Sequence, residues 1–283
     1  MSYKLNDDFV LEGQDVEYIN TPGKDSGIFS TGYPDMIVIH YTAGSSLDGA
    51  IKTLRDPRIK SSCHFVIGCN GKIVQLVPLN RIAWHAGKSS YDNRTGINRY
   101  SIGIELDNPG RLTKSGDNYR SWFGRVYSKD NVFEGVHRNE SVISYWHSYA
   151  EEQIACVFSL CHCLKELLTI QHVVGHEEIA LNRKTDPGPA FPLDKLRQEL
   201  EENRGDDDYD FPIDEDQKRE TSFGMVAASK LNFRKAPSVG SGLISSPLEE
   251  GTQVEIIDEK NDWLKVSIKQ TGWVKKEYIK INS

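Results

Sequence analysis

Three residues that could do hydrolytic chemistry lie close together in the segment 175–192. His176 and Asp186 are ten positions apart, and Lys184 precedes the aspartate by two. Imidazole nitrogens and carboxylate oxygens bind zinc, and a lysine beside them can stabilise an oxyanion. The run Pro187-Gly188-Pro189 predicts a stiff loop, because proline fixes φ. The same three residues are also explained as a surface histidine, a capping aspartate and a solvated lysine. A metal site here therefore needs a further ligand from another part of the chain.

A third candidate ligand stands at the end of an apolar run. Residues 36–41 read Met-Ile-Val-Ile-His-Tyr, a pattern typical of a central strand buried on both faces, with His40 at its C-terminal end. A shorter apolar run, 173–174, precedes His176. Open α/β sheets bind ligands outside the carboxyl ends of their strands, so we predict that His40, His176 and Asp186 meet there and hold one zinc ion. Either histidine alone is better explained as a satisfied or surface residue.

A carboxylate in a neighbouring strand is the candidate base. In the segment 101–107 Ile102, Ile104 and Leu106 alternate with Ser101, Gly103 and Glu105, which predicts a strand with Glu105 on its less apolar face. Hydrolysis at zinc needs a group that takes a proton from water, and Glu105 suits that role. The alternative is a strand residue that faces solvent.

Other patterns predict the elements that position these residues. Ser45 or Ser46 caps a helix that reaches Arg55, and Asn70-Gly71 between two apolar runs indicates a hairpin. Helical spacing of apolar residues predicts helices over about 149–169 and 193–202. Residues 108–148 have no clean periodicity and indicate an insertion or a long surface excursion, and residues 1–35 resist assignment.

Composition limits the class of protein. The 283 residues predict two domains, and the net charge of −7 is concentrated: residues 199–216 hold ten acidic residues and one arginine, which leaves +2 elsewhere. The sequence shows no basic face for nucleic acid, no membrane span and no sign of an obligatory protein partner. It also shows no signal peptide, so we expect the protein to be cytoplasmic as synthesised or exported by another route. The five cysteines are expected to be reduced, and Cys161 and Cys163, in a predicted helix, are expected to be buried small residues rather than metal ligands.

The last part of the chain changes in character. From about residue 222, short apolar runs are broken by Gly and Pro, which predicts a small β-barrel without catalytic groups, suited to binding. The predicted domains are 1–202, with core motifs in 36–200 and an N-terminal extension in 1–35, and 222–283. The acidic segment 203–221 is the predicted linker.

Several ordered motifs together resemble the zinc-dependent N-acetylmuramoyl-L-alanine amidases, a group that includes the peptidoglycan recognition proteins. They lie at residues 38–40, 62–67, 83–87, 101–106, 175–180 and 183–188. The resemblance implies an α/β fold with a mixed central sheet flanked by helices. It also implies zinc ligands at His40, His176 and Asp186, an acid/base at Glu105 and a transition-state lysine at Lys184. The tail resembles bacterial Src-homology-3-like wall-binding domains.

The resemblance implies cleavage of the amide between N-acetylmuramic acid and L-alanine, in peptidoglycan fragments or in the sacculus. His64, Trp84 and His85 are weaker candidates for lining the substrate groove, since aromatic and imidazole groups suit sugar and peptide contacts. The chain departs from phage members of the group, which carry a tyrosine just before the histidine equivalent to His64. Two alternatives stay open: a recognition protein without turnover, and a zinc peptidase that cuts within the stem peptide.

Overall fold

The computed structural model describes residues 3–202, 222–234, 237–239, 241, 243, 247–260, 262–267, 271–275 and 279–281. The chain divides into two compact units, Met1–Asp208 and Tyr209–Ser283. The predicted linker, 203–221, lies outside the described residues, and the predicted domain boundaries stay predictions. None of the helices in the described ranges is both long and apolar enough to cross a membrane.

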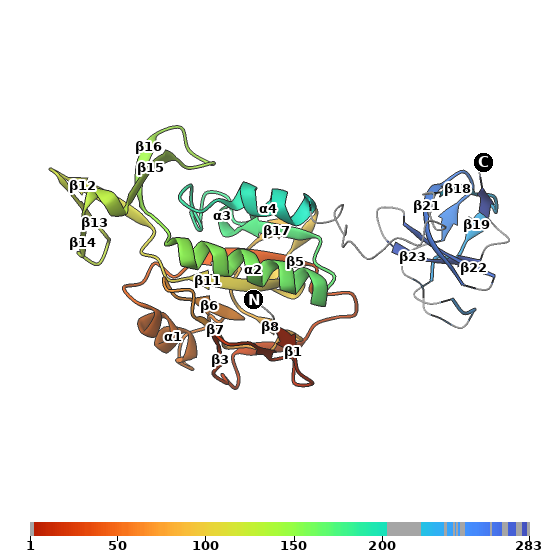
Figure 1. Ribbon diagram of the computed structural model, residues 1–283, viewed down its shortest axis with the longest axis horizontal. Helices are drawn as coiled ribbons and strands as arrows, with labels where there is room; N and C mark the ends of the chain where they lie inside the picture. Colours follow the sequence, from red (N-terminus) through yellow and green to blue (C-terminus); the bar gives the residue numbers. More distant parts are fainter. Residues whose placement is uncertain are drawn as a thin grey trace, which may run out of the picture. The chain divides into compact units, whose positions relative to one another are not determined.

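A six-stranded mixed sheet forms the centre of the first unit, in the order β17-β5-β11-β6-β7-β3 (Figure 1). Strands β17, β5, β11 and β6 run parallel, whereas β7 is antiparallel to β6 and β3 is parallel to β7. The bounds are β3 Val16–Tyr18, β5 Met36–Tyr41, β6 Phe65–Ile67, β7 Ile73–Gln75, β11 Ser101–Leu106 and β17 His172–Gly175. The predicted central strand and the hairpin at Asn70-Gly71 are confirmed, and Gly71 has the positive φ that this turn requires.

Helices cover both faces of this sheet, as predicted for the fold class. Helices α2 (Glu151–Leu167) and α4 (Leu193–Glu202) pack on the face that carries Ile37 and Ile39. Helix α1 (Leu47–Arg55), capped by the Ser46 side chain, packs on Val66 and Val74 of the opposite face. Side chains alternate along a strand, so Met36, Val38 and His40 lie on the face away from α2.

Short elements complete the first unit. Residues 1–35, which had no assignment from the sequence, contain β1 (Lys4–Leu5), β2 (Leu11–Glu12), β3 and β4 (Asp25–Ile28). The remaining short elements are β8 (Arg81–Ala83), β9 (Ser90–Tyr91), β10 (Arg94–Thr95), the 3-10 helix η1 (Ile97–Tyr100) and the four-residue helix α3 (His176–Ile179). His176 therefore begins a helical turn and does not lie in the stiff loop predicted for 175–192.

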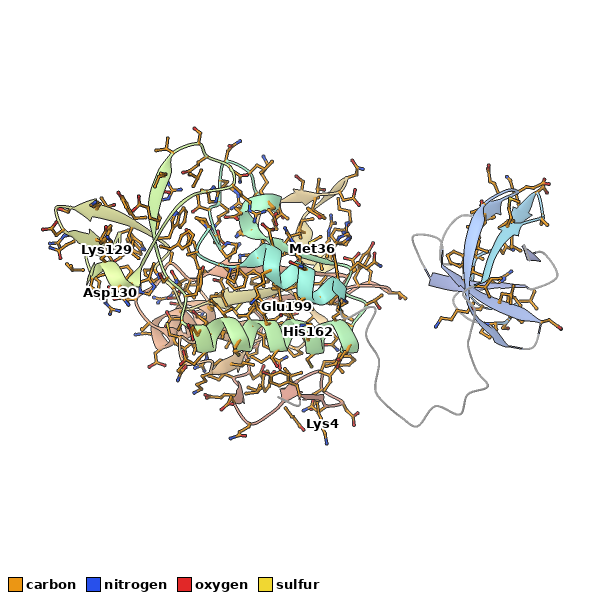
Figure 2. The ribbon with its side chains drawn as sticks, turned by 45° about the horizontal axis from the view of Figure 1, so that its top comes forward. Lys4, Met36, Lys129, Asp130, His162 and Glu199 are labelled. Atoms are coloured by element: carbon orange, nitrogen blue, oxygen red, sulfur yellow. The ribbon has the colours of Figure 1, made fainter. Side chains whose placement is uncertain are left out.

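The segment 108–148 folds into a sheet of its own, in the order β14-β13-β12-β16-β15, and projects from one end of the unit (Figure 1). Its elements are β12 (Arg111–Ser115), β13 (Asn118–Arg120), β14 (Val126–Tyr127), the 3-10 helix η2 (Lys129–Asn131), β15 (Val132–Val136) and β16 (Ile143–His147). Its strands are short and mostly exposed, so they show no apolar periodicity. Figure 2 shows Lys129 and Asp130 of η2 in this projecting part, away from His162 of α2.

The second unit is built from β-strands, in agreement with the predicted small barrel. A five-stranded sheet has the order β23-β22-β21-β18-β24, and β19 pairs with β20. The bounds are β18 Ser222–Val226, β19 Lys230–Leu231, β20 Leu248–Glu249, β21 Gln253–Lys260, β22 Trp263–Ser267, β23 Thr271–Lys275 and β24 Ile279–Ile281. Its core includes Phe233, Leu264 and Val266.

Candidate active site

The carboxyl ends of two parallel strands bring the predicted ligands together. His40 lies near the end of β5, and His176 directly follows β17, which pairs with β5 in parallel. Asp186 returns to the same place because its carbonyl accepts the backbone N–H of Glu177, 2.9 Å away. This placement follows the rule that ligands bind outside the carboxyl ends of strands in open α/β sheets.

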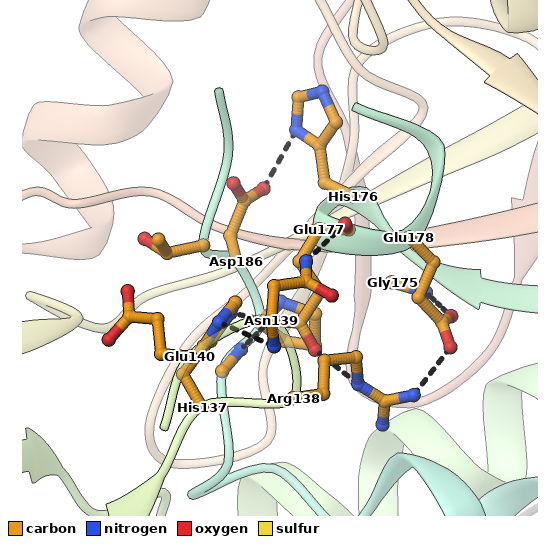
Figure 3. A network of polar contacts seen from close by, with 12 residues as sticks. His137, Arg138, Asn139, Glu140, Gly175, His176, Glu177, Glu178 and Asp186 are labelled. Carbon is orange, nitrogen blue, oxygen red and sulfur yellow. Dashed lines mark hydrogen bonds and ion pairs between the residues drawn. The ribbon is translucent and has the colours of Figure 1, made fainter. Parts of the chain in front are cut away.

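The three side chains form a small buried triangle. His40 Nδ1 lies 2.9 Å from His176 Nδ1 and 3.0 Å from Asp186 Oδ2, and His176 Nδ1 lies 2.9 Å from the same oxygen. Figure 3 shows the contact of His176 with Asp186. The residues are only 1%, 2% and 5% exposed, and they form a metal-compatible group.

A chain of hydrogen bonds fixes the tautomer of His40. The Ser101 hydroxyl donates to the Ile97 carbonyl, so Ser101 Oγ and the Ser101 carbonyl both act as acceptors for His85 Nε2, at 3.2 and 3.3 Å. His85 Nε2 therefore carries the proton, and His85 Nδ1 accepts from His40 Nε2 at 2.9 Å. The neutral His40 ring is left with a bare lone pair on Nδ1, which points into the triangle.

His176 presents a lone pair for a similar reason. Its Nε2 lies 3.1 Å from the Ala86 carbonyl, which can only accept, so Nε2 donates there and in the neutral ring the lone pair is on Nδ1. Two imidazole lone pairs and a carboxylate oxygen thus converge without a proton between them, an arrangement that a bound cation would stabilise. Ligands 2.0–2.1 Å from a tetrahedral zinc ion lie about 3.3 Å apart, so edges of 2.9–3.0 Å fit such an ion after slight expansion.

The electrostatics agree with this donor set. Burial, with a contribution from His176, lowers the pKa of His40 to about 4, so the ring is neutral at pH 7. The site therefore offers the neutral His40 imidazole beside the His176 imidazole and the Asp186 carboxyl group.

Glu105 lies beside the triangle on the adjacent strand. Its Cα pairs with that of His40 in the parallel register of β11 and β5, so both side chains lie on the same face of the sheet. Glu105 Oε2 is shielded from solvent and has no hydrogen-bond partner among the described residues. Burial, together with the charge of Asp186, raises the pKa of Glu105 to about 8, while Lys184 acts in the opposite direction. A carboxyl with this pKa can both take and give a proton near neutral pH.

These groups open into one cleft of about 790 Å³. Seven of the eight predicted site residues line it: Glu105, Lys184, Trp84, His85 and the three candidate ligands. His64 does not line the cleft. It is fully buried, and both ring nitrogens contact backbone groups: Nε2 the Arg81 carbonyl at 2.9 Å and Nδ1 the Gly103 N–H at 3.0 Å.

Comparison with known proteins decides the family. The family model of N-acetylmuramoyl-L-alanine amidases matches residues 30–189, which is more than half of the chain. The chain belongs to this amidase family. The resemblance drawn from the motifs is therefore confirmed, and a bacterial SH3 domain model matches residues 229–280.

Individual relatives of this amidase-family protein are similar over part of their length. The N-acetylmuramoyl-L-alanine amidase AmiD of Escherichia coli strain K12 is 33% identical over 176 residues, 58% of this chain and 52% of AmiD. The 1,6-anhydro-N-acetylmuramyl-L-alanine amidase AmpD of the same strain is 32% identical over 139 residues, 49% of this chain and 58% of AmpD. The chain thus spans little more than half the length of these two proteins.

Solved structures of two such proteins are also similar. A selenomethionine derivative of AmpD aligns with a TM-score of 0.46 and 24% identity, over 69% of this chain and 98% of that chain. AmiD from E. coli in complex with the substrate anhydro-N-acetylmuramic acid-L-Ala-D-gamma-Glu-L-Lys aligns with a TM-score of 0.44 and 34% identity, over 59% of this chain and 58% of that chain.

The insertion of this amidase domain braces the loop that carries Asp186 (Figure 3). His137 Nε2, at the end of β15, donates to Glu177 Oε2 at 2.6 Å, and Arg138 Nε lies 2.8 Å from Glu177 Oε1. Glu177 Oε2 also accepts the backbone N–H of Gly188 at 3.1 Å. Burial raises the pKa of Glu177, and the contacts with His137 and Arg138 offset part of that rise. This buried carboxylate therefore ties the insertion to the residues that follow Asp186.

Several cleft residues of the amidase domain were not predicted from the sequence. Tyr41 directly follows His40 in the chain, and Arg183 directly precedes Lys184. Tyr41 Oη is 2.8 Å from Thr185 Oγ1. Trp122 and Phe123 come from the insertion. The one signal for them was an aromatic pair before a glycine in a polar stretch, which indicates exposed aromatics at a turn.

Proposed function

We propose that the protein is a zinc-dependent N-acetylmuramoyl-L-alanine amidase with one zinc ion per chain. It would hydrolyse the amide between the lactyl group of N-acetylmuramic acid and the L-alanine that begins the stem peptide. The observation that carries the proposal is the convergence of three donor atoms beside Glu105, whose Oε2 is shielded from solvent and without a hydrogen-bond partner among the described residues, in one cleft. Membership of the amidase family supports the assignment of the reaction.

In this proposal His40, His176 and Asp186 hold the zinc ion. Zinc, when bound, supplies Lewis acidity toward the scissile carbonyl and toward the attacking water. Glu105 takes one proton from that water and passes it to the leaving amine nitrogen of L-alanine, while the lactyl carbon keeps the oxygen as a carboxylate. Lys184, which lines the cleft, would offer its cation to the oxygen that gains negative charge.

The surrounding residues position these groups. His85 holds the His40 ring in the tautomer with a bare Nδ1, and the contact of Tyr41 with Thr185 fixes the residue between Lys184 and Asp186. Trp84 and His85 lie where the substrate would contact the cleft wall. The C-terminal unit, which matches a bacterial SH3 domain, would bind cell wall and hold the enzyme near its substrate.

The test is digestion of defined muropeptides by the zinc-loaded protein, followed by mass spectrometry. The amidase reaction releases intact stem peptide and leaves an unsubstituted lactyl carboxylate on the sugar. Cuts within the stem would identify a peptidase instead, and zinc binding without any product would identify a recognition protein. Glu105→Gln protein is the control, since it keeps the three ligands. Parallel digestion of 1,6-anhydro muropeptides and whole sacculi separates the two substrate classes.

A further inference from the structure

The insertion places an aromatic tip at the rim of the cleft. Residues 121–125 connect β13 with β14, and Trp122 and Phe123 from this turn line the cleft together with Glu105 and the zinc-ligand candidates. Trp122 is 76% exposed, although an indole is among the side chains that gain most from burial. An exposed tryptophan that lines a polar cleft is available to a ligand.

Hydrogen bonds hold the backbone of this turn. The N–H of Ser121 donates to the Arg125 carbonyl at 3.0 Å, the N–H of Arg125 donates to Ser121 Oγ at 3.1 Å, and the N–H of Gly124 donates to the Ser121 carbonyl at 2.9 Å. Gly124 has a φ of 90°, a conformation that glycine adopts without strain.

Two further contacts fix the tip against the loop that follows His40. Trp122 Nε1 donates to the Ala43 carbonyl at 2.7 Å, and Arg125 Nη1 donates to the Ser45 carbonyl at 3.0 Å. The indole is therefore oriented before any ligand arrives, and its single polar group is already used. What Trp122 still offers is a flat apolar face, and Ser45 lines the same cleft with its hydroxyl group.

We propose that the face of Trp122 stacks on a pyranose ring in the glycan part of the substrate. This inference rests on the proposed amidase function, because that function defines a ligand with both a glycan and a peptide part. Pyranose rings present C–H groups on a flat face and hydroxyl groups at the edge, which matches an indole face in a cleft that Ser45 also lines. The small and charged side chains of a stem peptide of alanine, γ-glutamate and a diamino acid offer no such flat face.

The test compares two substrates that share the scissile bond. One is the disaccharide muropeptide, N-acetylglucosaminyl-N-acetylmuramoyl-L-Ala-D-γ-Glu-L-Lys, and the other is D-lactoyl-L-Ala-D-γ-Glu-L-Lys, which lacks both sugars. Trp122→Ala is expected to lower kcat/KM for the disaccharide muropeptide about tenfold, which is near the upper limit of the free energy of one aromatic contact. The same substitution should leave kcat/KM for the sugar-free lactoyl peptide unchanged. Trp122→Phe keeps an aromatic face and should retain most of the activity on the disaccharide substrate.

Controls separate stacking from a structural role. Phe133→Ala removes an aromatic side chain that is 40% exposed on β15 of the same insertion but does not line the cleft, and it should change neither rate. Equal losses on both substrates in Trp122→Ala and Trp122→Phe would show that the indole only anchors the Ala43 loop, and unchanged rates would show that it contacts no sugar. Either result overturns the proposal.

A binding measurement keeps this inference distinct from the proposed reaction. Titration of the zinc-loaded protein with the peptide-free disaccharide should shift the indole N–H resonance of Trp122, and Trp122→Ala should weaken binding about tenfold. A shift in a protein that releases no stem peptide would refute the amidase function and leave the sugar contact standing. Amidase activity without any shift of this resonance would support the amidase function and refute the sugar contact.

Discussion

Replacing His85 by phenylalanine should weaken zinc binding although His85 is not one of the three ligands. His85 Nδ1 accepts the Nε2 proton of His40 at 2.9 Å, in a region where His40 is 1% exposed. In His85→Phe protein the His40 ring has a buried N–H without its acceptor and is free to adopt the tautomer that protonates Nδ1. An unsatisfied buried donor costs roughly 1–3 kcal/mol. Loss of a hydrogen-bond partner behind a metal ligand lowers metal affinity roughly 10–100-fold, about 1.4–2.7 kcal/mol.

Zinc affinity would be measured by competition between the metal-free protein and a chromophoric chelator at pH 7.5. A second variant reaches the same contact without removing the imidazole: a Cβ on Gly103 would lie 2.4 Å from His85 Cγ, so Gly103→Ala must displace the ring. His172→Phe is the matched control, since His172 lies in β17 near His176 but outside the triangle. Wild-type zinc affinity in both His85→Phe and Gly103→Ala would refute the argument that His85 sets the tautomer of His40.

Three further outcomes are expected. Glu105→Gln should reduce kcat at least about 100-fold while zinc affinity stays within a few-fold of wild type, because the change removes the proton acceptor and no ligand; full turnover in a zinc-loaded variant would exclude Glu105 as the base. Zinc at 100 times its Kd should stabilise the folded protein by about 2.7 kcal/mol and raise the Tm of the first unit by roughly 5–10 °C, an effect that chelation and Asp186→Ala should both abolish in calorimetry. The third outcome concerns pH: burial lowers the pKa of His64 from 6.5 to about 4, so the unfolded state binds the extra proton first and stability is lost as pH falls from about 6.5 to 4. That loss is about 3 kcal/mol, and denaturant titrations of His64→Gln at pH 7 and pH 5 should show a smaller difference between the two pH values than wild type does.

The positions of the two candidate histidine ligands could be predicted because each depends on local sequence. An apolar run that ends in a histidine places His40 at a strand end, and the same logic places His176 after β17. The alternation in residues 101–106 predicted the strand that carries Glu105, whereas the parallel register that brings Glu105 beside His40 is known only from the structure. The helix from Leu193 to Glu202 was also predicted with its observed bounds.

The contacts of His85 and His64 could not be predicted, because each joins residues that are far apart in the chain. His85 was expected to line a substrate groove, and its contact with His40 depends on the bare face of Gly103, where a Cβ would meet the imidazole. His64 has the same residue type, yet its backbone hydrogen bonds keep it out of the cleft. Residue type alone does not separate these two histidines, whereas their packing against β11 does.

The insertion contributes to the site in two physically separate ways. At one point Trp122 lies on the cleft rim, and at another His137 holds the buried carboxylate of Glu177, which in turn accepts the N–H of Gly188. A buried acceptor left without its hydrogen-bond donor costs roughly 1–3 kcal/mol, so deletion of the whole insertion would destabilise the loop that carries Asp186. Loss of activity in such a deletion would therefore say nothing about substrate contact. Only single substitutions at the tip, with the His137 contact intact, can isolate what the insertion does for the ligand.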